Sequence, residues 1–308
     1  MPTVFGLDVR SDRILSFLEP GEAAPTGRGL ELAMLEPPAA IDWPAAAELI
    51  SDQRKPGGSV NFQIESDAEL GFRIWGPEYG ASVISPDGKS LVGAIAGGRD
   101  EAWQRLLVAQ ALPFAAVLQG LEALHASAVA SGQGAVAFSG PSGSGKTSLA
   151  LELHRRGAGF LADDVLALER VDGQLVAHPG APMAGIDRAE AERLSAAGGT
   201  ARPEVLAVDR REEVARVLTV PTPLPLQALF FLERRLDGPD QPHFEVAGDA
   251  QALLSATFNL VLTGAGRLER LLDACALLAG CRVERIACGP PVGVAELADA
   301  VEGRLRER

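Results

Sequence analysis

The chain has 308 residues, of which 47% are hydrophobic and 22% are charged, the balance of a globular protein with a sizeable core. Its formal net charge of −13 argues against a nucleic-acid partner, because proteins that bind nucleic acid usually carry a basic face. No apolar run approaches the length of about 18 residues that a membrane span needs, and no cationic signal-peptide start is present. We therefore expect no membrane partner and a cytoplasmic location.

The first part of the chain has the pattern of short strands and loops. Val60–Ile64 and Phe72–Trp75 alternate apolar and polar residues, which is typical of half-buried strands. Ala81–Ile84 and Ser90–Val92 flank a Pro-Asp-Gly turn and predict a hairpin. One short helix is expected over residues 44–54.

Two glycines, Gly97 and Gly98, end this pattern and predict two domains. Residues 1–98 would form a smaller, β-rich α+β domain for recognition or assembly, and residues 99–308 the larger catalytic domain. From Asp100 to about Leu121 apolar residues keep helical spacing, and Pro113 should kink or split that helix.

The remaining segments mix strands with helices, which predicts an α/β core with a mostly parallel or mixed sheet. The expected strands are Ala126–Ala130, Ala135–Ser139, Phe160–Leu168, Leu175–Ala177, Leu226–Leu232 and Val283–Ile286. The expected helices are Ser148–Arg156, Arg188–Ala197, Ala250–Leu262, Ala265–Leu278 and a closing helix from Val292.

Residues 140–147 read Gly-Pro-Ser-Gly-Ser-Gly-Lys-Thr, the phosphate-binding pattern called the P-loop. Glycines let backbone N–H groups converge on phosphate oxygens, and the helix that follows presents its positive end. In this pattern Lys146 reaches the β- and γ-phosphates of ATP or GTP, and the Thr147 hydroxyl binds Mg²⁺. The alternative is a glycine-rich loop before an ordinary helix, but here the loop follows an apolar strand and opens an amphipathic helix, as the motif requires.

The residues expected to surround the nucleotide phosphates form one continuous run: Gly140, Pro141, Ser142, Gly143, Ser144, Gly145, Lys146, Thr147 and Ser148.

Two adjacent acids, Asp163 and Asp164, lie within an apolar stretch, where carboxylates need a compensating partner. Near a phosphate loop that partner would be Mg²⁺, or an acceptor hydroxyl for which one acid acts as general base. Because neighbouring strand residues point to opposite faces, only one acid should face the phosphates directly. The alternative is a strand end that emerges into solvent.

His125 precedes the strand pair that leads into the loop. From the spacing alone a lone histidine is more often a structural hydrogen-bonding group than a catalyst. His154, His178 and His243 are expected to be structural or exposed.

Together these motifs resemble the catalytic core of the HPr kinase/phosphorylase family, bacterial serine kinases related in fold to phosphoenolpyruvate carboxykinase. The resemblance rests on a histidine 21 residues before the loop lysine, the loop itself, Leu-Glu-Leu-x-x-Arg-Gly after it, and Leu-Ala-Asp-Asp ending 18 residues after the lysine. It is strong from His125 to Leu168 and weak over the rest of the last 200 or so residues. It implies a P-loop kinase core of that type behind a smaller β-rich N-terminal domain.

The resemblance also implies roles for individual residues. Lys146 would bind phosphate, Thr147 would bind Mg²⁺, and Asp164 would deprotonate the acceptor hydroxyl. His125 would support the active site, and Asp163 would orient groups or assist metal binding. The family's tendency to form hexamers makes a homo-oligomer a candidate state.

The chain departs from the family pattern at three places. Thr147-Ser148 stands where the family has Ser-Glu, and residues 180–186 lack the family's metal-binding acid, with Asp187 a weak substitute. Residues 221–227, where an arginine loop associated with phosphorolysis would fall, contain no arginine. The chain is therefore more similar to HPr-kinase-related proteins of other pathways, including lasso peptide kinases, than to enzymes with phosphorylase activity on HPr.

The expected function is a kinase that uses ATP and Mg²⁺ to phosphorylate a hydroxyl, with a serine of a peptide such as a lasso peptide precursor, or a small metabolite, as acceptor. An ATP-binding regulatory or assembly protein of the same fold, without phosphotransfer, remains the alternative.

Overall fold

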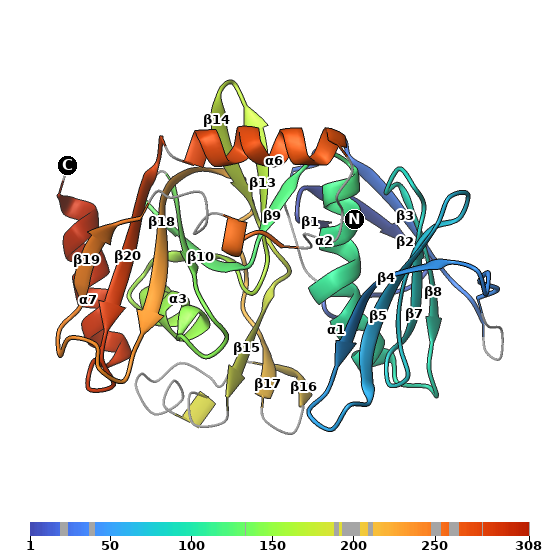
Figure 1. Ribbon diagram of the computed structural model, residues 1–308, viewed down its shortest axis with the longest axis horizontal. Coiled ribbons are helices and arrows are strands. Elements are labelled where there is room, and N and C mark those ends of the chain that lie inside the picture. The colour runs from blue at the N-terminus through green and yellow to red at the C-terminus, as the bar shows by residue number, and fades with distance from the viewer. Residues whose placement is uncertain are drawn as a thin grey trace.

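The computed structural model describes residues 1–18, 24–36, 41–132, 134–187, 191–192, 204–208, 212–247, 254–258, 265–278 and 280–307. Within these residues the chain is a mixed α/β protein rich in sheet, as expected, with a large sheet towards each end and helices between and around them (Figure 1). In this part of the chain no helix is both long and apolar enough to cross a membrane.

Eight strands from the first part of the chain form one sheet, in the order β1-β2-β3-β8-β7-β6-β5-β4. They are β1 (Thr3–Val4), β2 (Leu7–Ser11), β3 (Gly29–Met34), β4 (Glu48–Arg54), β5 (Val60–Asp67), β6 (Gly71–Gly76), β7 (Gly80–Ile84) and β8 (Ser90–Ile95). β2, β3 and β8 are parallel, and the other pairs are antiparallel. The strands expected within β5 and β6 and the expected β7–β8 hairpin are confirmed.

The helix expected over residues 44–54 is wrong. After a turn in which the Ala47 N–H donates to the Pro44 carbonyl (3.1 Å), β4 runs antiparallel to β5 along the edge of the sheet. Pairing with β5 therefore outweighs the local helical preference, which is a weak determinant in so short a segment.

Residues 100–118 form an interrupted helix in three parts. They are α1 (Asp100–Leu106), a π-helical turn η1 (Leu107–Ala111) and α2 (Leu112–Leu118). Pro113 lies in the first turn of α2, and the wider turn before it is closed by the Leu112 N–H on the Leu107 carbonyl. The break expected at Pro113 is confirmed, because proline cannot donate the hydrogen bond of a continuous helix.

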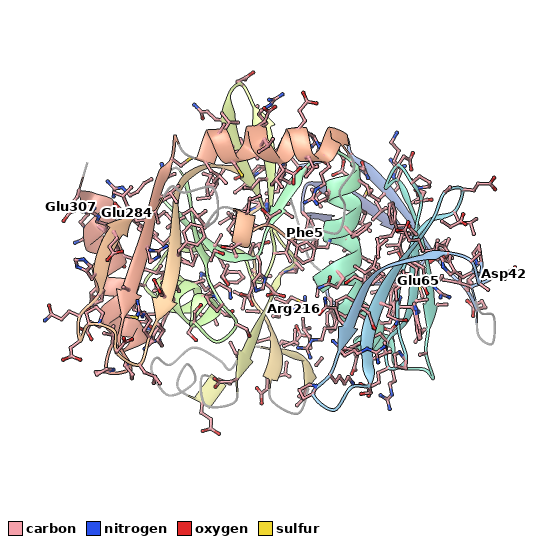
Figure 2. All side chains as sticks on the ribbon, in the orientation of Figure 1. Phe5, Asp42, Glu65, Arg216, Glu284 and Glu307 are labelled. Carbon is pink, nitrogen blue, oxygen red and sulfur yellow. The ribbon has the colours of Figure 1, made fainter. Side chains whose placement is uncertain are left out.

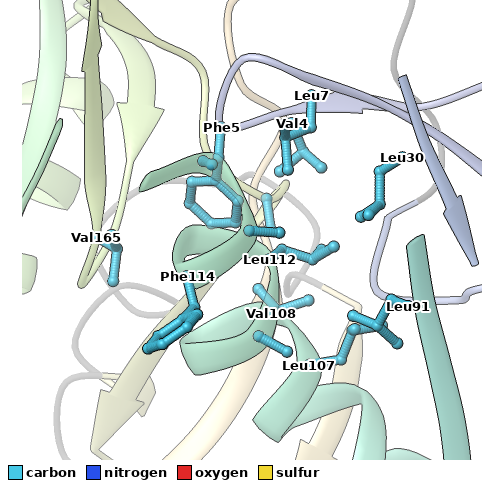
Figure 3. Packing of buried hydrophobic residues seen from close by; sticks show 14 of the residues in the cluster. Val4, Phe5, Leu7, Leu30, Leu91, Leu107, Val108, Leu112, Phe114 and Val165 are labelled. Atoms are coloured by element: carbon cyan, nitrogen blue, oxygen red, sulfur yellow. The ribbon is translucent and has the colours of Figure 1, made fainter. Parts of the chain in front are cut away.

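These helices bury their apolar faces against the first sheet. Trp103 is fully buried, and its Nε1 donates to the Ser82 hydroxyl of β7 (3.2 Å). In Figure 3 the cluster contains helix residues and sheet residues together: Leu107, Val108, Leu112, Phe114, Val4, Leu7, Leu30 and Leu91.

The same cluster extends beyond the first sheet. Phe5, near the middle of the molecule (Figure 2), and Val165, from the second half of the chain, both belong to it. The boundary between residues 1–98 and 99–308 stays a prediction, and the apolar core is continuous across it.

Nine strands between residues 122 and 288 form the other large sheet. In it β12-β10-β11-β18-β14-β13-β9 are neighbours, β18 also pairs with β20, and β20 pairs with β19. Their bounds are β9 (Glu122–Leu124), β10 (Ala126–Ser131), β11 (Gly134–Ser139), β12 (Gly159–Ala162), β13 (Leu166–Val171), β14 (Gln174–His178), β18 (Leu224–Arg234), β19 (His243–Val246) and β20 (Arg282–Cys288). β11, β18 and β20 are parallel and the other pairs antiparallel, so the expected mixed sheet is confirmed.

The single strand expected over Phe160–Leu168 is wrong, because two strands lie there. β12 pairs with β10, whereas β13 pairs with β9 and β14. The chain turns between them at Asp163 and Asp164, and Asp164 has a φ of 65° that no regular strand contains.

Helices cover both faces of this sheet. α3 (Lys146–Arg155) and α7 (Val294–Arg306) share a buried cluster with Val136 and Phe138 of β11, whereas α6 (Ala265–Leu278) shares one with Ala135 and Ala137. A third, three-stranded sheet has the order β15 (Met183–Asp187), β17 (Glu212–Arg216), β16 (Val205–Val208).

The expected helices over residues 148–156 and 265–278 are confirmed as α3 and α6, and the closing helix is α7. The helix expected over residues 188–197 falls almost entirely outside the described residues. Only residues 254–258 of the helix expected over 250–262 are described, and there Thr257 forms an isolated antiparallel bridge with Leu124. That helix does not continue through Thr257, because its backbone pairs with β9 instead.

Candidate functional site

The P-loop joins β11 to α3 through a backbone that only glycines adopt readily. Gly140, Gly143 and Gly145 have φ values of 146°, 79° and 94°. A side chain at Gly140 would place its Cβ 2.5 Å from the Leu232 carbonyl oxygen of β18, so the loop can pack against that strand only with glycine there. The backbone of the loop therefore favours glycine at all three positions, whatever the loop binds.

α3 presents an uncapped N-terminus to the loop. No side chain caps it, and its first turn carries no acidic residue. The partial positive charge of the helix end is therefore not neutralised by the helix itself, which favours an anion at this position.

Lys146 lies at the start of α3, and only 7% of it is exposed. Its ammonium donates to the Gly140 carbonyl (2.9 Å) and the Pro141 carbonyl (3.2 Å). Burial lowers the pKa of Lys146, and the nearby charges of Asp164 and Asp163 oppose that shift. The ammonium is thus enclosed by the loop at the position where a phosphate would be held.

Asp163 receives hydrogen bonds from three different elements. The hydroxyls of Ser127 on β10 (2.6 Å) and Thr147 on α3 (2.7 Å) donate to its Oδ1, and the Gly185 N–H of β15 donates to Oδ2 (3.0 Å). Burial, together with the charge of Asp164, raises the pKa of Asp163, although the three donors oppose this. The phosphate loop and the acid pair therefore belong to one site.

Asp164 differs from its neighbour in exposure and backbone. Its side chain is 58% exposed. The Val165 N–H donates to the Asp163 carbonyl (2.8 Å), which closes a three-residue turn with Asp164 at its centre. A three-residue turn of this kind with positive φ is rare and strained for a residue other than glycine. The turn leaves the Asp164 carboxylate exposed, whereas the Asp163 carboxylate is bonded within the fold.

His125 contacts Asp164 twice. Its Nδ1 lies 2.9 Å from the Asp164 carbonyl oxygen and 3.2 Å from Oδ1 of the Asp164 side chain. The backbone of His125 is fixed as well, because its N–H donates to the Ala256 carbonyl (2.6 Å) and its carbonyl accepts from the Ser139 hydroxyl (2.9 Å). Histidine and acid are thus a contacting pair at the exposed side of the site.

The strand directions explain why these groups meet. β12 is antiparallel to β10, which is antiparallel to β11, so the carboxyl ends of β11 and β12 lie at the same edge of the sheet. The P-loop follows Ser139 at that edge, Asp163 follows Ala162, and His125 immediately precedes β10 there.

Three contributors to the site were not predicted from the sequence: Ser127, Ser139 and Gly185. Ser127 is fully buried in β10, and a hydroxyl between apolar residues, two positions after His125, is a signal that could have pointed to it. Gly185 acts only through its backbone N–H, which no sequence pattern reveals.

Other candidates lie away from these contacts. Asp187, the weak substitute for a family metal ligand, is the last residue of β15 and exposed. His154 contacts the Ala158 carbonyl after α3 (2.8 Å), and His178 contacts Glu169 (2.9 Å). Both histidines are therefore structural hydrogen-bonding groups, as expected.

The far end of α3 is anchored by Glu152, of which 1% is exposed. It accepts hydrogen bonds from Arg155 (2.6 and 3.0 Å) and Arg156 (3.0 Å), and Arg156 also donates to Asp299 of α7 (2.6 Å). The hydrogen bond from Arg155 is the main cause that lowers the pKa of Glu152 to about 2. This network holds the helix that carries Lys146 and Thr147 against α7.

No protein-family model matches this chain, and no curated protein matches it. Among solved structures, the HPr(Ser) kinase/phosphatase from Coxiella burnetii is similar over 60% of this chain and 93% of that chain, with 14% sequence identity and a TM-score of 0.30. At that TM-score the similarity carries no argument about family, activity or site residues. The roles of the site residues therefore depend on the contacts described above.

We expect the Glu152 network to make stability depend on pH in the acid range. Because the pKa of Glu152 falls from 4.5 in the unfolded chain to about 2 in the folded one, its stabilisation is complete above pH 4.5 and is lost as the pH falls towards 2. Glu152→Gln should lower the free energy of unfolding near neutral pH by up to about 3 kcal/mol, and this difference should shrink on acidification.

Urea unfolding followed by circular dichroism at a series of pH values measures this difference. Glu31→Gln, which changes an exposed ion pair with Arg10, is the matched control and should show almost no pH-dependent loss. A difference between wild type and Glu152→Gln that stays constant with pH would contradict the assignment.

Proposed function

We propose that this chain is an ATP-dependent kinase that uses Mg²⁺ and transfers the γ-phosphoryl group to a hydroxyl. The observation that carries this proposal is the 2.7 Å hydrogen bond from Thr147 to Asp163, which joins the phosphate loop to the acid pair. A glycine-rich loop with Lys146 and the N-terminus of α3, beside two carboxylates in different environments, fits the positioning and charge neutralisation on which phosphoryl transfer depends. The resemblance of the sequence to HPr-kinase-related proteins supports a serine of a peptide, or a small metabolite, as acceptor.

The residues present fit Mg²⁺. The Thr147 hydroxyl and the Asp163 carboxylate are hard oxygen donors, and Mg²⁺ in such sites is bound by one or two carboxylates together with substrate phosphates. When bound, the ion would neutralise charge on the β- and γ-phosphates. Ser127 and the Gly185 N–H would hold the carboxylate in place for that role.

Asp164 is the proposed general base. Its carboxylate is exposed and not bonded to the P-loop threonine, so it can accept the proton of an incoming hydroxyl. As that oxygen forms a bond to the γ-phosphorus, the bond from the γ-phosphorus to the bridging oxygen breaks and ADP leaves. Lys146 and the N-terminus of α3 stabilise the charge on the phosphate oxygens, and His125 orients the Asp164 carboxylate.

The decisive experiment is incubation of the protein with labelled ATP, Mg²⁺ and candidate peptide and small-molecule acceptors, beside an ATP-only sample. Transfer of label to an acceptor supports the kinase. Tight ATP binding with no transfer to any acceptor would instead support the alternative, a nucleotide-binding regulatory protein.

Lys146→Ala should reduce turnover by about 100-fold or more, because it removes the ammonium that would stabilise the negative charge of the transferred phosphoryl group. Steady-state kinetics with a verified acceptor measures the loss. Lys89→Ala changes a lysine whose side chain is 70% exposed and should leave turnover unchanged. Equal rates for the two variants would remove Lys146 from the mechanism.

Asp164→Asn should leave ATP binding within about twofold of wild type and reduce transfer by about 100- to 10,000-fold, because the amide cannot accept the proton. Calorimetry gives the binding constant and label transfer gives the rate. Asp172→Asn is the matched control, since Asp172 is an exposed acid that also has positive φ, 49°. Full transfer by Asp164→Asn would show that another group is the base.

Ser127→Ala should raise the KM for Mg-ATP by about three- to tenfold with a smaller change in kcat, because Asp163 loses one of its donors. Ser82→Ala removes an equally buried hydroxyl in the first sheet and controls for lost stability. If both variants changed KM alike, the change in KM would come from lost stability and not from the lost hydrogen bond to Asp163.

A further inference from the structure

A recess adjoins the P-loop, and its other walls come from β18 and the segment after β20, across β11 from β10 and β12. It has a volume of about 370 Å³ and is lined by Pro141–Ser144, Glu233–Leu236 and Pro290. These segments lie at the carboxyl ends of the three parallel strands β11, β18 and β20. Crevices outside the carboxyl ends of parallel strands are where α/β proteins bind their ligands.

The walls of this cleft are held in place by contacts within the fold. The P-loop packs on β18 at Gly140, and the Arg234 guanidinium donates to the carbonyls of Gly289 (3.3 Å) and Val292 (2.9 Å). The end of β18 is thereby tied to the turn between β20 and α7. The cleft is thus a built part of the sheet edge.

The order of the strands determines which end of a nucleotide could reach the cleft. The sheet runs β12-β10-β11-β18-β20, with Asp163 and His125 beside β12 and β10, and the cleft beside β18 and β20. Figure 1 shows β18 and β20 side by side, near α7 and the C-terminus. A nucleotide with its γ-phosphate next to Asp164 would therefore extend its sugar and base towards β18 and β20.

The chemistry of the cleft suits a flat ring with a polar edge. Leu236 is 94% exposed, Pro290 is exposed beside it, and the Arg235 side chain, 56% exposed, contacts Asp237 (3.3 Å). Apolar side chains and a planar guanidinium are the groups that stack on aromatic rings.

A second observation in the cleft also points to a ligand. The Ser144 side chain is almost completely buried, yet its hydroxyl has no hydrogen-bond partner among the described residues. Buried hydroxyls are usually paired, so this unpaired hydroxyl in a residue that lines the cleft is consistent with a group that is supplied on binding.

We propose that the cleft between Pro141–Ser144, Glu233–Leu236 and Pro290 binds the base and ribose of the nucleotide, with Leu236 as its principal apolar contact. This assignment rests on the proposed ATP-dependent function, and it predicts that the affinity for the nucleoside part is separable from the affinity for phosphates.

Titration calorimetry with Mg-ATP and with magnesium tripolyphosphate, which has the phosphates but no nucleoside, separates the two contributions. The wild-type protein should bind ATP more tightly than tripolyphosphate. Leu236→Ala should weaken ATP binding by about three- to tenfold and leave tripolyphosphate binding unchanged, because only apolar contact is removed. Leu272→Ala, at a leucine of α6 that is 66% exposed, is the matched control and should change neither affinity.

The outcomes are distinguishable. If wild-type protein binds tripolyphosphate and ATP equally and Leu236→Ala changes neither, the cleft assignment is overturned while phosphate binding at the loop stands. If wild-type protein binds neither compound, both the cleft assignment and the proposed function are overturned. Equal weakening of ATP and tripolyphosphate by Leu236→Ala would mean that Leu236 affects the loop and not a nucleoside contact.

Discussion

The carboxylate of Asp163 is the contact on which the arrangement of the candidate site depends. It joins β10 through Ser127, α3 through Thr147 and β15 through Gly185, three elements that are distant in the sequence. Each donor is satisfied by the same acid, so displacement of any one element leaves a polar group without its partner. The helix that follows the P-loop is therefore positioned relative to the sheet by the same carboxylate that is proposed to assist metal binding.

The first sheet contributes no side chain to the site described above, but it helps to stabilise the backbone turn at Asp164. The positive φ of Asp164 costs on the order of 1–3 kcal/mol, which the surroundings must offset. Val165, the next residue, is 1% exposed and packs in the cluster that contains Phe5 and Phe114. Burial of Val165 in a core built largely by the first sheet and α2 thus stabilises the strained turn that separates the two acids.

Local sequence patterns predicted correctly those helices, strands and turns whose residues determine them alone. The wrong predictions share one cause, which is dependence on segments from elsewhere in the chain. The strands at β5 and β6, the β7–β8 hairpin, α6 and the break at Pro113 all follow from periodicity or from proline chemistry. β4, expected as a helix, and the division between β12 and β13 depend on which strand lies alongside. Ser127 and Gly185 could not be assigned for the same reason, since their partner Asp163 comes from elsewhere in the chain.

Strand direction also accounts for the two sides of the P-loop. β12, β11, β18 and β20 all run the same way, and β10, which lies between β12 and β11, runs against them. This one reversed strand brings His125 to the edge at which the other four end, beside Asp163 and Asp164. On the other side of the loop no reversed strand intervenes, so three carboxyl ends lie together and leave the cleft at Leu236. In the proposed function, this edge therefore has two parts, with proton transfer and metal binding beside β10 and recognition of the nucleoside beside β18.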